Sequence, residues 1–128
     1  MAVEFLPTVE GTAPPRGPYS MGVKVTGTLV FVAGQLGTDE SGQIVPGGAG
    51  AQARQCLRNI QRVLEAAGSS MDKVFKVSIF LTNMDDLPEV SAARREVWQG
   101  PFPAATTVEV SRLAHPDAVI EIEAVAVL

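Results

Sequence analysis

The chain has 128 residues, of which 46% are hydrophobic and 19% are charged, so it suits one compact domain and is too apolar for a disordered protein. Its net charge of −4, with ten scattered Lys and Arg residues, argues against the basic surface of a nucleic-acid-binding protein. The single cysteine rules out an internal disulfide and leaves too few thiolates for a metal site.

The longest uncharged run, residues 25–38, has 14 residues and contains three glycines, so it is too short and too interrupted to cross a membrane. The first residues contain neither a basic region nor an apolar segment of the signal-peptide type. We therefore expect no membrane contact, a cytoplasmic location and a single domain over residues 1–128.

The N-terminal region is rich in proline, and residues 1–16 are predicted to form an extended arm that leads to Tyr19. Hydrophobic residues then alternate over residues 21–26 and again over residues 29–33, separated by Gly27 and Thr28. This pattern predicts a β-hairpin. The turn-rich residues 34–50 are expected to form a surface loop.

From Ala51 onward the apolar residues recur at helical spacing until Gly68, which is placed to end a helix. Cys56 lies within this apolar stripe, so we interpret it as a small buried side chain rather than a reactive thiol.

Alternation returns over residues 74–82, with large apolar side chains on both faces, as is typical of a central strand. A second helix is predicted after it, with Asp86 and Glu89 as a capping box, and Trp98 at its end is interpreted as a packing anchor.

Residues 101–113 and 119–127 form two further alternating runs, which predict a hairpin-like pair of strands. Glu121 and Glu123 share a face of the second strand, which is otherwise made of Ile, Val and Ala. At least one of the two carboxylates must therefore lie at an edge, meet water or find a donor.

The complete order, ββαβαββ, predicts an α+β domain in which two helices cover one face of a mixed sheet. The other face also carries apolar side chains, and a chain of this length has no further helices to cover it. We therefore expect a partner copy to bury that face in a homo-oligomer.

Six segments in order carry a family resemblance: GPYS (17–20), FVAGQLG (31–37), AQARQCLRNIQRVLEAAGSS (51–70), KVSIFLTNMDD (76–86), FPAATTVEV (102–110) and IEIEAVA (120–126). Together they resemble the Rid family, also called RidA/YjgF or endoribonuclease L-PSP. The resemblance implies a chorismate-mutase-like fold with a mixed six-stranded sheet and two helices on one face. It also implies a homotrimer that binds a small molecule in the clefts between its subunits.

The resemblance further implies an activity that needs no cofactor and no metal: the hydrolysis of reactive enamines and imines, such as 2-aminoacrylate, to 2-oxo acids and ammonia. By position it implies Glu121 and Tyr19 as catalytic residues. Its substrate-binding positions are occupied here by Gly34, Gln35, Leu36, Ser91, Ala105 and Thr107.

Ala105 stands where the family pattern has an arginine that binds the substrate carboxylate. A methyl group cannot replace a bidentate guanidinium, so we expect deaminase activity to be impaired or its substrate specificity altered. Arg16, three residues before Tyr19, is a candidate replacement.

Three classes of function follow. The first is a Rid enzyme, an imine deaminase or a related hydrolase or lyase, acting on a substrate that does not need the arginine. The second is a catalytically inactive Rid-fold protein that binds a small ligand or has a regulatory role as a trimer. The third is a ribonuclease, which the acidic charge and the lone His115 disfavour.

Overall fold

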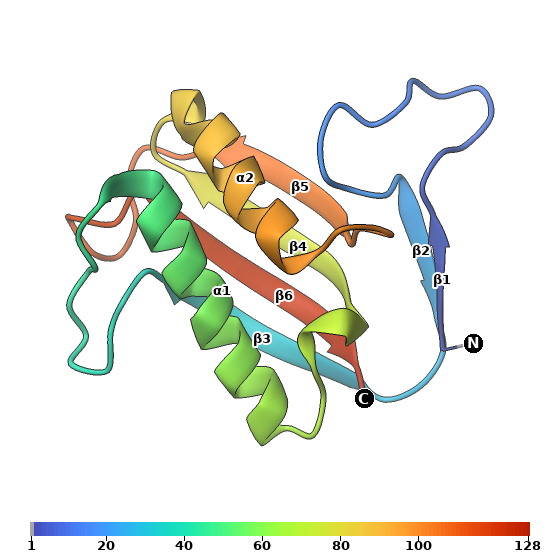
Figure 1. The fold of residues 1–128 in the computed structure, drawn as a ribbon, viewed down its shortest axis with the longest axis horizontal. Helices are drawn as coiled ribbons and strands as arrows, with labels where there is room; N and C mark the ends of the chain where they lie inside the picture. The colour runs from blue at the N-terminus through green and yellow to red at the C-terminus, as the bar shows by residue number, and fades with distance from the viewer. Residues whose placement is uncertain (1) are drawn as a thin grey trace.

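The computed structural model describes residues 2–128 and contains six strands and two α-helices (Figure 1). The chain begins with strands β1 (Val3–Leu6), β2 (Gly22–Val25) and β3 (Leu29–Leu36), followed by helix α1 (Gly48–Ala66) and the short 3-10 helix η1 (Met71–Lys73). The second half consists of β4 (Val74–Leu81), the 3-10 helix η2 (Met84–Asp86), α2 (Leu87–Val97), β5 (Ala104–Glu109) and β6 (Ile120–Val127).

The strands form two sheets rather than one six-stranded sheet. Four of them make a mixed sheet in the order β3-β6-β4-β5, in which β4 and β5 are parallel, and β1 pairs with β2 in a separate two-stranded sheet. The predicted central strand at residues 74–82 is confirmed, since β4 lies between β6 and β5. The predicted mixed sheet with two helices is also present, but the strand at residues 3–6 was missed within the extended arm.

Both predicted hairpins are wrong. β2 does not pair with β3, because β3 pairs with β6 while β2 pairs with β1. Likewise β5 and β6 are not neighbours, because β4 lies between them and pairs with both. In each case two alternating runs that follow one another along the chain pair with other strands instead.

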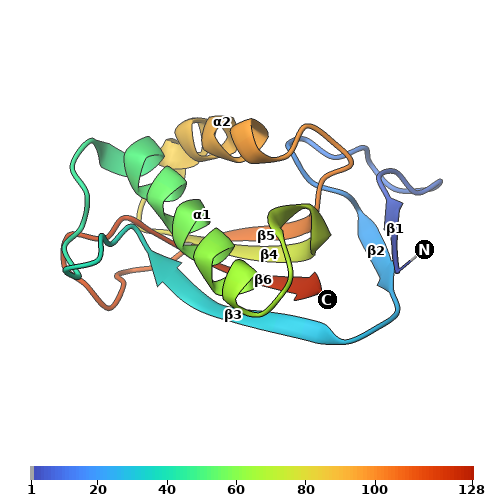
Figure 2. The ribbon, with the colours of Figure 1, turned by 60° about the horizontal axis from the view of Figure 1, so that its bottom comes forward.

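Both helices cover the same face of the four-stranded sheet (Figure 2). Helix α1 begins three residues earlier than predicted, at Gly48, and its end is followed by Gly68 in the left-handed conformation with φ of 85°. The loop predicted over residues 34–50 is correspondingly shorter, because its first residues belong to β3 and its last ones to α1.

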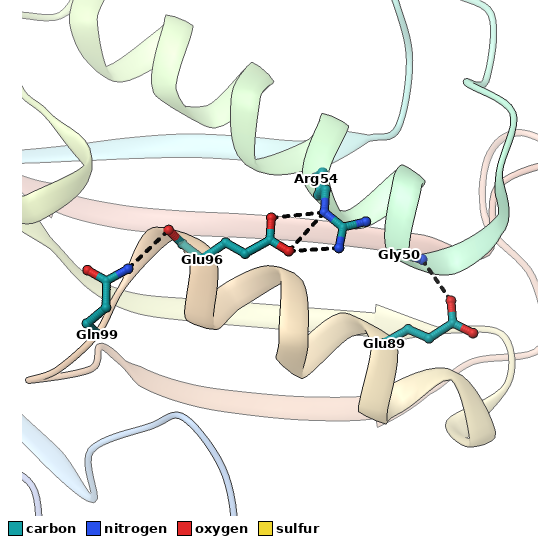
Figure 3. A network of polar contacts seen from close by, with 5 residues as sticks. All are labelled: Gly50, Arg54, Glu89, Glu96 and Gln99. Carbon is teal, nitrogen blue, oxygen red and sulfur yellow. Dashed lines mark hydrogen bonds and ion pairs between the residues drawn. The ribbon is translucent and has the colours of Figure 1, made fainter.

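The predicted capping box of α2 is not formed. Asp86 makes no capping hydrogen bond, and the Asn83 side chain instead accepts from the backbone N–H of Asp85 at the start of η2. The Glu89 carboxylate reaches the other helix, where it accepts a 3.2 Å bond from the backbone N–H of Gly50 (Figure 3). Glu89 thus stabilises the first turn of α1, whose N-cap Gly47 has no side chain to do so.

A second polar contact joins the helices further along. Arg54 on α1 donates from Nε and Nη2 to the Glu96 carboxylate on α2, with the shortest distance being 2.7 Å (Figure 3). The pair is exposed to solvent, so it contributes little to stability. Packing of the helices on the sheet supplies the main stabilisation.

The core between helices and sheet contains fully buried residues from α1 and the central strands: Cys56, Ile60, Leu64, Val77, Ile79, Ile120 and Ile122. Trp98 is buried as expected, and its indole N–H donates to the carbonyl of Met71 at 2.9 Å. Within residues 2–128 no helix is long and apolar enough to span a bilayer.

Among residues 2–128, no helix covers the opposite face of the sheet, which we call the open face. Register places Phe31 opposite Val125, and Phe80 opposite Glu121, on this face. Phe31 is 73% exposed, and Val108 of β5 is 40% exposed. Large apolar side chains at these positions are typical of a surface that contacts another molecule.

The burial of Cys56 predicts that its thiol is unreactive in the native protein. Burial, followed by the charge of Glu121, raises the pKa of Cys56 to about 12, so the thiol stays protonated at pH 8. We expect no reaction of the native protein with a thiol reagent such as DTNB and complete reaction in guanidinium chloride. Ala92→Cys, which adds a thiol at an exposed position of α2, should react at once. Rapid labelling of Cys56 in the native protein would contradict its assignment to the core.

Candidate functional site

A hollow of about 330 Å³ lies where α2 meets the edge strand β5, and we call it the edge hollow. Its volume is within the range that small-molecule sites occupy. It is lined by Arg16, Gly17, Pro18, Tyr19, Leu87, Ser91, Arg94, Ala105, Thr106 and Thr107. Four residues that the family resemblance placed in a site are therefore brought together here: Tyr19, Ser91, Ala105 and Thr107.

The segment around Tyr19 is held against β5 by its neighbour Ser20. The Ser20 hydroxyl donates to the carbonyl of Phe102 at 2.5 Å, and its backbone N–H donates to Pro103 at 3.1 Å. Ser20 also forms a parallel bridge with Ala104. These contacts join the end of the N-terminal arm to the start of β5, which places Tyr19 beside Ala105.

Side-chain periodicity explains how α2 and β5 line the edge hollow. Leu87, Ser91 and Arg94 follow one another at spacings of four and three residues, so they lie on one face of α2. On β5, Ala105 and Thr107 pair with Val77 and Ile79, whose side chains are buried beneath the helices. Both β5 residues therefore point to the helix-covered face of the sheet.

Arg94 belongs to this site and was missed in the sequence. Its side chain is only 3% exposed, and its Nη2 donates to the carbonyl of Pro18 at 2.7 Å. Burial, followed by the like charge of Arg95, lowers the pKa of Arg94 to about 10. One signal was available: Arg94 is four residues after the buried Val90, on the apolar stripe of its helix. Arg16, the candidate replacement for the absent arginine, is exposed and also lines the edge hollow.

Glu121 lies in a different place, on the open face beside β3. The pairing of β3 with β6 is irregular between Val32 and Gln35, and Leu36 is opposite Glu121. This irregularity brings the backbone of Gly34 under the carboxylate. A methyl group at Gly34 would lie 2.8 Å from Cδ and 3.0 Å from Oε1 of Glu121. We call Gly34, Leu36 and Glu121 the Glu121 cluster.

Other predicted residues near this cluster have separate surroundings. Gln35 is opposite Ile122, and its side chain donates to the carbonyl of Ala33 and lines a surface hollow with Asn59 and Arg62 of α1. Glu123 is exposed, whereas Glu121 is half-buried. Neither ion pair formed within residues 2–128 involves Glu121.

The edge hollow and the Glu121 cluster do not meet within one chain. Ala105 and Thr107 point to the helix-covered face, whereas Glu121 is paired with Phe80 on the open face. β4 also separates β5 from β6 in the sheet. One chain thus presents a lined hollow without a carboxylate and a carboxylate without a hollow.

A larger hollow, of about 640 Å³, is formed by the loops before β6 and contains His115. His115 Nδ1 accepts a 3.0 Å bond from the backbone N–H of Asp117, which gives this side chain a structural role in its turn. No predicted site residue lines it. Within residues 2–128 no group of three His, Cys, Asp or Glu side chains is arranged to hold a metal ion.

Comparisons with known proteins all indicate the same family. The model of the family "Endoribonuclease L-PSP" matches residues 10–128. A RutC family protein from Pyrococcus horikoshii is 43% identical, covering 91% of this chain and 92% of its own. A 2-iminobutanoate/2-iminopropanoate deaminase from Dermatophagoides farinae is 39% identical, covering 89% of this chain and 88% of its own.

Among solved structures, a Rid family protein of unknown function from Yersinia pestis matches with a TM-score of 0.87 and 30% identity, covering 100% of both chains. This structural match confirms the predicted chorismate-mutase-like fold class. Since the family model spans nearly the whole chain and relatives at about 40% identity span most of it, the chain belongs to the endoribonuclease L-PSP family, which is the Rid family.

Proposed function

We propose that the protein hydrolyses small reactive imines and enamines as a homotrimer whose sites combine two chains. The observation that carries the proposal is the separation of Glu121 from the edge hollow in a chain related to imine deaminases. Each site would consist of the edge hollow of one copy and the Glu121 cluster of its neighbour.

The open face supports the participation of a second copy. Phe31 is 73% exposed and lies on the same strand as Gly34, and Leu29 on that strand is 42% exposed. A neighbouring copy seated there would bury these side chains, which favours association. The edge strand β5 of that copy would carry its hollow toward Glu121.

The proposed reaction is the addition of water to the carbon of a C=N bond. Glu121 orients the water and takes one of its protons as the oxygen attacks the carbon, and the imine nitrogen gains a proton. The hydroxyl proton of the resulting carbinolamine is then transferred to its nitrogen, so that the C–N bond breaks, ammonia leaves and a carbonyl group remains. Tyr19 is placed to donate a hydrogen bond from the wall of the hollow.

Ala105 bears on which substrate is accepted. The hollow has a methyl group at the position where the family resemblance implies a carboxylate-binding arginine. We propose that activity on amino-acid-derived imines is therefore weaker than in relatives with that arginine, or that the protein acts on other imines. The same observation favours the second candidate, a Rid-fold trimer that binds a small ligand without hydrolysing it.

An assay with 2-aminoacrylate generated in situ tests the proposed reaction. The protein should accelerate loss of the imine, and Glu121→Gln should lower that acceleration by about 10²- to 10⁴-fold because the general base is removed. Glu123→Gln, an identical change two residues away on the exposed part of β6, should leave the rate unchanged. If the wild-type rate equals that of buffer, and imines lacking a carboxylate are also left intact, the ligand-binding candidate replaces the deaminase.

Two glycines on adjacent stretches of chain separate a site effect from a stability effect. Gly34→Ala places a methyl against the flexible end of Glu121, so the carboxylate should move and activity fall while the fold persists. Gly37→Ala places a methyl 2.8 Å from Cα of Gln52 in the backbone of α1, so it should destabilise the fold by about 1–3 kcal/mol. Urea unfolding and the imine assay measure the two effects. An equal loss of stability in both variants would show that Gly34 serves the fold alone.

A further inference from the structure

The edge hollow is positively charged although the chain as a whole is acidic. Two arginines are among its ten lining residues, and none of the ten is acidic, whereas the net charge of the chain is −4. Arg16 is exposed, so water solvates it. Arg94 is different because only 3% of it is exposed, and its charge lies at the buried wall of the hollow.

The contacts of Arg94 leave its charge uncompensated. Nη2 donates to the carbonyl of Pro18, but Nε is buried and has no hydrogen-bond partner among residues 2–128. Neither ion pair formed within those residues includes Arg94, and the charge that acts on its pKa is the like charge of Arg95. Even with its pKa lowered to about 10, the guanidinium is protonated at neutral pH. A buried, unpaired cation is unfavourable, and an anion beside it removes that penalty.

Anchoring the Pro18 carbonyl does not require this charge. That contact uses one N–H of a group that has five, and a neutral amide could provide it without burying a cation. The other N–H groups of the guanidinium are available to a ligand in the edge hollow. Leu87, Ser91 and Arg94 lie on the face of α2 that lines this hollow, across from Ala105. The guanidinium of Arg94 on α2 thus lines the same hollow as Ala105 on β5.

We propose that Arg94 binds the carboxylate of a small 2-oxo or 2-imino acid in the edge hollow, in place of an arginine at position 105. The substrate class rests on the proposed function, but the binding of a carboxylate is separable from its hydrolysis. Arg94 then determines specificity for an anionic substrate through the guanidinium N–H groups that the Pro18 carbonyl does not engage.

The test compares the binding of 2-oxobutanoate with that of its neutral analogue 2-oxobutanamide by isothermal titration calorimetry. We expect the carboxylate to bind more tightly by about 10- to 100-fold, as is typical of a hydrogen bond to a charged group. Arg94→Met should abolish this preference. Arg95→Met, the same substitution at the next and exposed residue of α2, should retain it.

Two further measurements guard against a variant that merely loses its fold. Arg94→Met combined with Ala105→Arg returns a guanidinium to the hollow from the other side and should regain the preference. In the wild-type protein, the Nε–H resonance of Arg94 should shift on addition of 2-oxobutanoate and stay in place with 2-oxobutanamide.

Three outcomes would overturn the assignment: no preference for the carboxylate in the wild-type protein, an undiminished preference in Arg94→Met, or an unmoved Nε–H resonance. A smaller oligomer in Arg94→Met would overturn it too, because Arg94 would then pair with a carboxylate of a neighbouring copy. Glu121→Gln should keep the preference while losing hydrolysis. Failure of hydrolysis with the preference intact contradicts only the proposed function, and the reverse result contradicts only the role of Arg94.

Discussion

The alternation of side chains along β6 is the constraint on which the rest of the structure depends. β6 pairs with both β3 and β4, so its register fixes the centre of the sheet. Ile122 and Ala124 point into the core beneath the helices. Because side chains alternate along a strand, Glu121 and Glu123 point to the open face. The same pairing that builds the core therefore keeps Glu121, the carboxylate that we propose for catalysis, away from the hollow beside α2.

The two halves of the proposed site differ in what each lacks. The Glu121 cluster has a carboxylate above a glycine backbone but lies on an exposed apolar face, where a dry site needs a cover. The edge hollow has walls, a tyrosine and a buried guanidinium but no acid or base to activate water. The arrangement that we propose joins them between copies, and it would cover the exposed Phe31 and bring an anion to Arg94, which forms no ion pair within residues 2–128.

Local periodicity in the sequence predicted both helices, the central strand β4 and the buried positions of Cys56 and Trp98, because each depends on neighbours within a few residues. Strand pairing could not be predicted in this way. The pairing of β3 with β6 joins residues separated by about two-thirds to three-quarters of the chain length, and its irregularity at Gly34 has no local signature. The family resemblance indicated Tyr19, Ala105 and Glu121. It did not indicate Arg94, and periodicity did not either, because a charged residue of a helix is ordinarily expected to face water.

The central claim is that Glu121 and the edge hollow act together only between two copies, and complementation tests it most directly. Glu121→Gln and Tyr19→Phe chains, each impaired alone in imine hydrolysis, are refolded together, and mixed oligomers are verified by native mass spectrometry. If each site takes one half from each of two chains, random mixing should restore about a quarter of the wild-type rate, because a quarter of the sites combine two unmodified halves. A rate no higher than the mean of the two single variants, in verified mixed oligomers, would contradict the account.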